Sequence, residues 1–462
     1  MKLSIDRKSW ILIAIGTGSF MSALDASVVN TILPIVREAF QSNVATIQWV
    51  VTIYLLVLSG LLLTFGRLGD LRGHKSVYIW GFLIFVASSA LCGAAWSPGV
   101  LIFFRGLQGI GGAILAANSS AIISRNIPPA ERGRAFGLVS MLTYLGLTVG
   151  PSLGGWLAHA FSWRVIFYIN VPVGALALTL GWIFIPKEAS IETGKRFDIV
   201  GAILFLAGLT GLMLGLNKGA EWGWSSPTVL GLLVGAVVLL AAFIQVERRS
   251  PEPMLDLSLF RVPLFSMSTI SAILNYICVY SITFLMPFYL IQGLGMNTAQ
   301  AGLLLTIQPI LMAITAPISG ALSDRIGSRL PGMVGMAVLG IGLFLLSRLG
   351  PDSSLWLVGL GLGIAGIGTG AFISPNTSAL MGAAPRSQQG VASGVLGTAR
   401  SLGMVLGIGL AGAILTTQLA QSIPNALYNG IGQAFLVAAG VAVLGIITSA
   451  IKEETKSIKV GK

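Results

Sequence analysis

The chain has 462 residues, of which 55% are hydrophobic and only 10% are charged, and its mean hydropathy is +0.87. This composition excludes an ordinary soluble domain, and apolar runs of about 20 residues recur from one end to the other. The net charge of +12 could indicate a nucleic-acid partner, but the basic residues gather where the apolar runs end, which argues against one. We therefore expect a protein that is embedded in a lipid bilayer.

Fourteen apolar segments are long enough to cross a membrane as helices. They lie near residues 10–34, 46–66, 76–95, 99–124, 134–158, 164–185, 198–216, 228–246, 264–291, 299–322, 331–349, 354–381, 389–417 and 428–450. Because this number is even, both termini are expected on the same side of the membrane.

The basic residues are distributed unequally between the two sides. With the N-terminus in the cytoplasm, 22 of the 28 Lys and Arg residues lie on the cytoplasmic side and only four, Arg37, Arg164, Lys218 and Arg348, on the other. By the positive-inside rule, this predicts a multi-pass protein of a prokaryotic plasma (inner) membrane with cytoplasmic termini. Of the two arginines left within spans, Arg400 has no acid at its depth in the second half, and the sequence assigns it no role.

The two halves of the sequence repeat each other, as in many transporters. Gly66–Asp70 matches Gly320–Asp324 at an offset of 254. Four glycines of the fifth span, at positions 133, 137, 146 and 150, recur at an offset of 257. This offset exceeds the six-span unit by roughly 65 residues, enough for two further spans. We predict a six-helix bundle in residues 1–190, an inserted helix pair and linker in 191–262, and a second six-helix bundle in 263–462.

Asp25 is the acidic residue that lies deep inside a span, about 15 residues or roughly 22 Å from the cytoplasmic end of the first helix. Placing a carboxylate there costs at least about 2.5 kcal/mol. We therefore expect Asp25 to face a water-filled cavity and to bind and release protons, with a structural acid held by a neighbouring helix as the alternative.

Arg105 lies in the fourth span at a similar depth, so it could form an ion pair with Asp25. The alternative is that Arg105 only donates to backbone carbonyls of the first helix. Gln108 follows one helical turn later and could extend a polar network.

A charged loop follows the second span. Gly66, Arg67, Asp70 and Arg72 lie at a helix end, where opposite charges could form a contact that breaks when the cytoplasmic side opens. Asp324 and Arg325 form a weaker copy in the second half. Anchoring at the membrane border is the alternative interpretation of both clusters.

The fifth span combines glycines with a proline, which favours close helix contact and a kink. The residues are Gly146, Gly150, Pro151, Gly154 and Gly155. Generic packing of small residues would explain the glycines alone.

Several aromatic and amide side chains could bind flat lipophilic molecules by stacking and by cation–π contact. These predicted substrate-binding residues are Asn30, Trp49, Tyr54, Gln108, Phe284, Tyr289 and Gln308. Aromatic residues in spans also face lipid or fill the core, which remains the alternative for each of them.

The sequence does not indicate catalysis or a bound cofactor. Cys92 and Cys278 lie inside apolar spans, where we expect packing residues and not a metal site. A phosphate-binding loop of the type GxxxxGK followed by Ser or Thr is absent, which disfavours an ATP-driven pump. We therefore expect neither enzyme activity, nor a cofactor, nor a metal.

These segments together resemble the motifs of the major facilitator superfamily, specifically its fourteen-helix drug:proton antiporter branch. Gly66–Lys75 resembles the cytoplasmic loop signature of the superfamily, and Arg105–Gly112 resembles a fourth-helix motif whose arginine is implicated in proton coupling. Gly146–Gly155 is similar to the fifth-helix motif of antiporters. Leu24–Pro34 looks like the first-helix motif of the branch, whose acid is taken as the coupling residue. The resemblance covers nearly the whole chain.

The resemblance implies an all-α integral membrane protein of the major facilitator fold, with two six-helix bundles and two inserted helices. It implies a monomeric, proton-coupled antiporter that exports lipophilic compounds, cationic or neutral, by alternating access. Two alternatives remain, which are export of an endogenous metabolite, lipid or siderophore, and a receptor or scaffold that does not transport. Unlike many multidrug members, the second half has no acid well inside a span, since Asp198 and Glu221 are peripheral, and this disfavours dicationic drugs.

Overall fold

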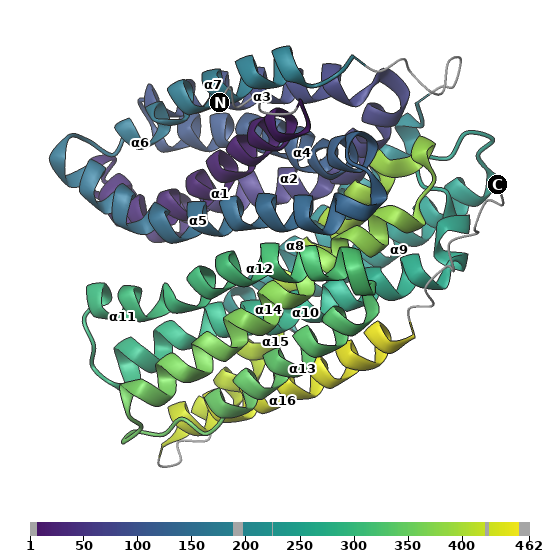
Figure 1. Cartoon of the computed structure of the whole chain (residues 1–462). Helices are drawn as coiled ribbons and strands as arrows, with labels where there is room; N and C mark the ends of the chain where they lie inside the picture. The colour runs from purple at the N-terminus through teal and green to yellow at the C-terminus, as the bar shows by residue number, and fades with distance from the viewer. Residues whose placement is uncertain (1–6, 188–196, 224, 421–424, 452–462) are drawn as a thin grey trace, which may run out of the picture.

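The computed structural model describes residues 7–187, 197–223, 225–420 and 425–451. This part of the chain contains 14 helices that are long and apolar enough to cross a membrane, and no strand. They form two bundles that lie one above the other in Figure 1, purple to teal and green to yellow. The expected boundary between residues 190 and 191 lies outside the described residues.

The first bundle contains α1 to α7, and the inserted pair α8 and α9 follows it. With the single 3₁₀ turn η1, the bounds are α1 Arg7–Ala39, α2 Val44–Arg72, α3 His74–Gly93, α4 Pro98–Asn126, η1 Pro129–Glu131, α5 Arg132–Ala160, α6 Val165–Tyr168, α7 Asn170–Phe184, α8 Ile199–Trp222 and α9 Pro227–Arg249.

The second bundle contains α10 to α16. Its bounds, with three short segments, are η2 Leu257–Arg261, α10 Pro263–Pro287, the π-helical η3 Phe288–Gly293, α11 Thr298–Leu305, α12 Ile307–Ile326, α13 Arg329–Leu346, α14 Leu355–Ala383, η4 Arg386–Gln388, α15 Gln389–Ala420 and α16 Ala426–Ala450. Because the number of spans is even, α1 begins and α16 ends on one side of the molecule, which we call the terminal face.

Paired glycines give the two bundles the same internal packing. In the first bundle, a Cβ on Gly109 would lie 2.8 Å from a backbone oxygen of α2, and one on Gly111 would lie 2.6 Å from a backbone nitrogen of α3. In the second bundle, Gly366 leaves no room for a Cβ against α12, and Gly368 leaves none against α13. α4 and α14 therefore occupy equivalent positions, each pressed between two neighbours.

The predicted spans differ from the helices mainly at charged ends and at breaks. The second helix continues beyond the expected end at residue 66 to Arg72. Its last turns contain charged residues, and a hydropathy window does not detect a charged helix end. The sixth span breaks at Ile169, between α6 and α7. The tenth breaks at Thr306, three residues before Pro309, which has no N–H to donate to the helix.

The inserted pair packs along the interface of the two bundles. α8 contacts both α2 and α15, and Leu206 of α8 fills the space beside Gly60 of α2. The linker after α9 buries Met254 and Leu259 in the same core as the first bundle, so its apolar side faces protein. Burial alone would raise the pKa of Asp256 in this linker, but hydrogen bonds, including that from Gln388, more than offset burial, so its pKa is lowered.

Candidate functional site

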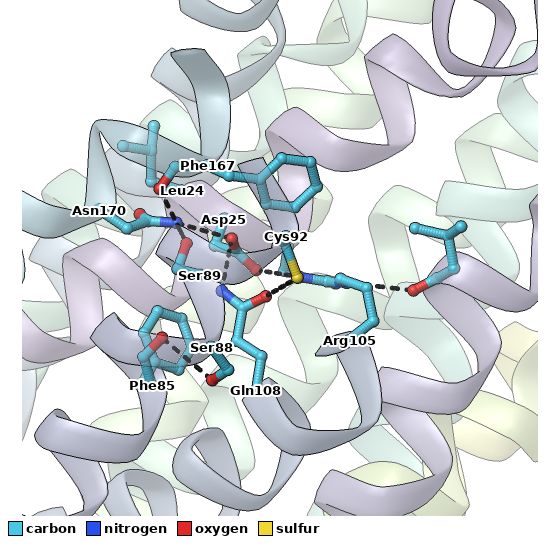
Figure 2. A network of polar contacts seen from close by, with 12 residues as sticks. Leu24, Asp25, Phe85, Ser88, Ser89, Cys92, Arg105, Gln108, Phe167 and Asn170 are labelled. Carbon is cyan, nitrogen blue, oxygen red and sulfur yellow. Dashed lines mark hydrogen bonds and ion pairs between the residues drawn. The ribbon is translucent and has the colours of Figure 1, made fainter. Parts of the chain in front are cut away.

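An ion pair lies inside the first bundle (Figure 2). Asp25, near the middle of α1, accepts a hydrogen bond of 2.7 Å at Oδ2 from Nη1 of Arg105 on α4. The two residues are only 2% and 1% exposed. The two charges that the sequence places at one depth are therefore in direct contact.

Two amides complete the surroundings of the carboxylate. Gln108 donates to Oδ1 of Asp25 at 3.0 Å, and Asn170 donates to the same oxygen at 2.8 Å. Asn170 also donates to Ser89 at 3.0 Å, and Ser89 donates to the carbonyl of Phe167 at 2.8 Å. Asn170 was not predicted from the sequence. Its position could have indicated a functional residue, because it is an amide inside an apolar span, two residues ahead of Pro172.

Asp25 is enclosed by protein and is not among the residues that line the cavity between the bundles. It lies among α1, α4 and α7, and the guanidinium and the two amide N–H groups donate to its oxygens. A buried ion pair of this kind is tolerated only when hydrogen bonds satisfy the remaining oxygen lone pairs, as they do here. Arg105 also donates to a backbone carbonyl, that of Val50, at 3.1 Å. This carbonyl belongs to α2, whereas the alternative considered from the sequence placed such a carbonyl on the first helix.

Tyr54 connects the ion pair to the space between the bundles. The guanidinium carbon of Arg105 lies 4.2 Å from the centre of the Tyr54 ring, which is a cation–π contact. Tyr54 also lines the central cavity described next. One aromatic ring therefore separates the buried charges from that cavity.

A cavity of about 440 Å³ lies between the two bundles, at mid-height of the spans. The first bundle lines it with parts of α1, α2, α4 and α5, the second with parts of α10, α14 and α15, and α8 contributes Met213. Its lining combines aliphatic side chains with serine and threonine hydroxyls and with aromatic rings. Among the described residues that line the cavity, Arg400 is the one charged side chain.

Arg400 is partly exposed in this cavity and is held by tyrosines of α10. Its guanidinium carbon lies 5.3 Å from the ring centre of Tyr276, and the guanidinium donates a hydrogen bond to the hydroxyl of Tyr280. No described Asp or Glu forms an ion pair with it. Arg400, to which the sequence assigned no role, therefore lies in the cavity between the two bundles.

The residues predicted to bind substrate lie in different places. Tyr54 lines the cavity, whereas Gln108 belongs to the ion-pair network and Asn30 is exposed and donates to its own helix. The other four are buried or half-buried in the cores of the bundles and are not among the residues that line the cavity: Trp49, Phe284, Tyr289 and Gln308. Periodicity could not tell which helix faces meet across the interface.

At the terminal face, Asp70 joins the two bundles. Its carboxylate accepts hydrogen bonds from the backbone N–H groups of Gly390 at 3.0 Å and Val391 at 2.9 Å, which begin α15 of the other bundle. Arg125 and His74 contact the same carboxylate at 2.9 Å and 3.2 Å. An anion at a helix N-terminus is favourable because it compensates the unpaired N–H groups and the helix dipole.

Asp324 makes the mirrored contact. It accepts from the N–H groups of Gly133 at 2.7 Å and Arg134 at 2.9 Å, at the start of α5. The backbones also touch, because Gly66 leaves no room for a Cβ against Gly390, and Gly320 leaves none against Gly133. The bundles are therefore closed against each other at the terminal face, and in Figure 1 they separate toward the end that carries α6 and α11.

The remaining predicted gating residues surround these two caps. Arg67 is buried, whereas Arg72 and Arg325 are exposed. Arg125 was missed, although it contacts Asp70 and donates to the carbonyl of Arg386 at 2.7 Å.

The glycines of the fifth span contact α1. A Cβ on Gly146 would lie 2.6 Å from the carbonyl oxygen of Phe20, and Gly150 and Gly154 pack on Ser27 and Val28. By contrast, Pro151 is exposed and Gly155 has no neighbour within 4 Å. The close contact therefore holds α5 against the helix that carries Asp25.

Comparisons with known proteins agree with this architecture. A family model described as Major Facilitator Superfamily matches residues 15–199, 191–408 and 268–460. The riboflavin transporter RibZ of Clostridioides difficile is 34% identical over 460 residues, which cover 98% of this chain and 100% of that protein. The multidrug resistance protein Stp of Mycobacterium tuberculosis is 35% identical over 413 residues, covering 89% and 76%. The tetracenomycin C resistance and export protein of Streptomyces glaucescens is 32% identical over 419 residues, covering 90% and 77%.

Proposed function

Because the chain belongs to the major facilitator superfamily, we propose that it is a proton-coupled antiporter that exports lipophilic compounds by alternating access. The observation that carries this proposal is the buried ion pair of Asp25 and Arg105, which Tyr54 connects to the cavity. Relatives named for multidrug resistance and for antibiotic export support the direction of transport. The riboflavin transporter among them favours an endogenous aromatic metabolite as the alternative cargo.

The terminal face is the cytoplasmic side in this proposal, and the protein works as a monomer in the inner membrane of a prokaryote. The excess of Lys and Arg at the loops of that face supports this orientation. The conformation described here then has its cytoplasmic side closed by the caps of Asp70 and Asp324. Release of both caps would open the cavity to the cytoplasm while the opposite side closes.

Protonation of Asp25 is the proposed coupling step. An ionised Asp25 holds Arg105 with a charge-assisted hydrogen bond, and a proton on the carboxylate removes that charge. Arg105 then interacts more with Tyr54 and with the carbonyl of Val50, which belong to α2. Because Asp70 lies in the last turn of α2, a shift of α2 relative to α1 reaches the cap on α15.

The proton gradient supplies the free energy for this cycle. One proton that moves inward gains about 2.3 kcal/mol per 100 mV of membrane potential, in addition to the pH difference. The scaffold alternative is disfavoured, because a passive protein needs neither a buried carboxylate nor mirrored caps.

The test uses everted membrane vesicles, in which export appears as uptake. We expect respiration to drive uptake of at least one of three probes, riboflavin, the lipophilic cation ethidium and 2-naphthoate, and a protonophore, which removes both the pH difference and the membrane potential, to reduce it. Asp25→Asn should lower this uptake more than tenfold while retaining exchange of internal for external probe, because exchange needs no net proton movement. Asp352→Asn, on an exposed loop residue, is the matched control. Unchanged uptake by Asp25→Asn, or no gradient-driven uptake of any probe by the wild type, contradicts the proposal.

A further inference from the structure

We propose that the cargo of this transporter is an aromatic monocarboxylate, which Arg400 binds through its guanidinium in the central cavity. This inference rests on the proposed transport function and specifies its substrate class. It differs from the sequence-based expectation of cationic or neutral cargo.

The charged groups in and around the cavity leave it with a net positive charge. Arg105 is compensated by Asp25 at 2.7 Å and lies behind Tyr54, so this pair adds little net charge to the cavity. Arg400 has no such partner among the described acids, and no Asp or Glu is among the residues that line the cavity. The cavity is therefore positively charged, which repels a cation and attracts an anion.

Arg400 places a guanidinium without an acidic partner among the described residues inside a membrane span. A lone charge is costly there unless water, a counter-charge or aromatic faces compensate it. Among the described side chains, the compensation comes from two tyrosines, Tyr276 at 5.3 Å and Tyr280, and from no carboxylate. A carboxylate can accept two parallel hydrogen bonds from a guanidinium, so a bound carboxylate would complete the site.

The volume and the lining residues of the cavity suit an aromatic cargo. A volume of about 440 Å³ is in the range of small-molecule sites and accommodates a ligand of two or three rings. Phe136 of the first bundle and Phe372 of the second lie in the lining with Tyr54, so aromatic surfaces are present on both sides. Ser59 and Ser401 hydrogen-bond to each other at 2.9 Å across the interface, one residue from Arg400. A cargo that touches Arg400 therefore also touches both bundles.

This assignment predicts how transport responds to voltage. Exchange of one exported monoanion for one entering proton moves two charges, a neutral cargo moves one, and a monovalent cation moves none. Each charge changes the limiting accumulation ratio about 50-fold per 100 mV. A carboxylate should therefore respond to membrane potential more steeply than its amide.

The binding test compares three compounds with the same ring: 2-naphthoate, 2-naphthamide and 2-naphthylmethylammonium. Isothermal titration calorimetry on purified wild-type protein should show that the carboxylate binds at least tenfold more tightly than the other two. Arg400→Gln should remove this preference by weakening binding of the carboxylate much more than binding of the amide, and Arg400→Lys should retain part of it. Arg348→Gln is the control, because Arg348 is an exposed arginine that stacks on Phe344 outside the cavity.

The outcomes separate this inference from the proposed function. Tighter binding of the ammonium compound, or equal carboxylate binding by wild type and Arg400→Gln, overturns the inference. Because the wild-type comparison needs no variant, misfolding of Arg400→Gln would leave the test intact. Carboxylate-selective binding without uptake driven by a proton gradient would contradict the proposed function alone, and proton-driven uptake of riboflavin without carboxylate selectivity would contradict the inference alone.

Discussion

Replacement of Asp70 by Asn should open the terminal face. The carboxylate accepts two backbone N–H bonds from the start of α15 and contacts Arg125 at 2.9 Å, all in a buried position. An asparagine has one acceptor oxygen and no charge, so one N–H and the guanidinium lose their partner. Breaking a buried pair costs about 3 to 5 kcal/mol. Even 3 kcal/mol favours the open state of this face by about 150-fold.

Thiol labelling measures this shift directly. A Ser120→Cys substitution places a thiol in the cavity, in the half of α4 that leads to the terminal face. Cys92 and Cys278 are 0% exposed, so they contribute little background. In everted vesicles, a membrane-impermeant maleimide should label this thiol about 100-fold faster when Asp70→Asn is present. Asp352→Asn should leave the rate unchanged.

The equivalent cap at Asp324 allows the effect of Asp70→Asn to be compared with that of a weaker contact in the same assay. Asp324 accepts two backbone N–H bonds, but no described Lys or Arg forms an ion pair with it. Its replacement by Asn should cost about 1 to 2 kcal/mol, which corresponds to a 5- to 30-fold faster labelling rate. The reasoning is refuted if Asp324→Asn accelerates labelling as much as Asp70→Asn, or if neither variant changes the rate.

Two further substitutions test the interface and the coupling path. Tyr54→Phe keeps the aromatic ring beside Arg105 and should retain gradient-driven uptake within about twofold. Tyr54→Leu loses a cation–π contact of about 1 to 2 kcal/mol and should reduce uptake about 5- to 30-fold. Equal activity of the two variants would argue against a role for the contact. Gly137→Ala places a Cβ 2.5 Å from Cα of Pro317 in the other bundle, so it should also speed labelling at position 120. Gly155→Ala, where no atom lies within 4 Å, serves as its control.

The sequence by itself determined the features that depend on local composition. Apolar segments of sufficient length predict the 14 spans, because a span must satisfy its backbone within one helix. The internal repeat of glycines predicted two related bundles, and the glycines of α4 and α14 show the same correspondence, because Gly109 and Gly111 recur as Gly366 and Gly368 in equivalent packing. The family could also be identified, because its motifs are contiguous segments. Asp25 and Arg105 could be paired in advance because helical rise converts residue number into depth.

Only the tertiary structure decided which side chains share the space between the bundles. Hydropathy gives the depth of a residue but not its direction, so six of the seven predicted substrate-binding residues lie outside the cavity lining, and Arg400 had no role. The caps of Asp70 and Asp324 join segments that are 320 and 191 residues apart, a distance over which no local pattern carries information. The same holds for the surroundings of Asp25, where Asn170 and Gln108 donate to its carboxylate. These contacts depend on how the two bundles dock, and docking is a property of the packed helices together.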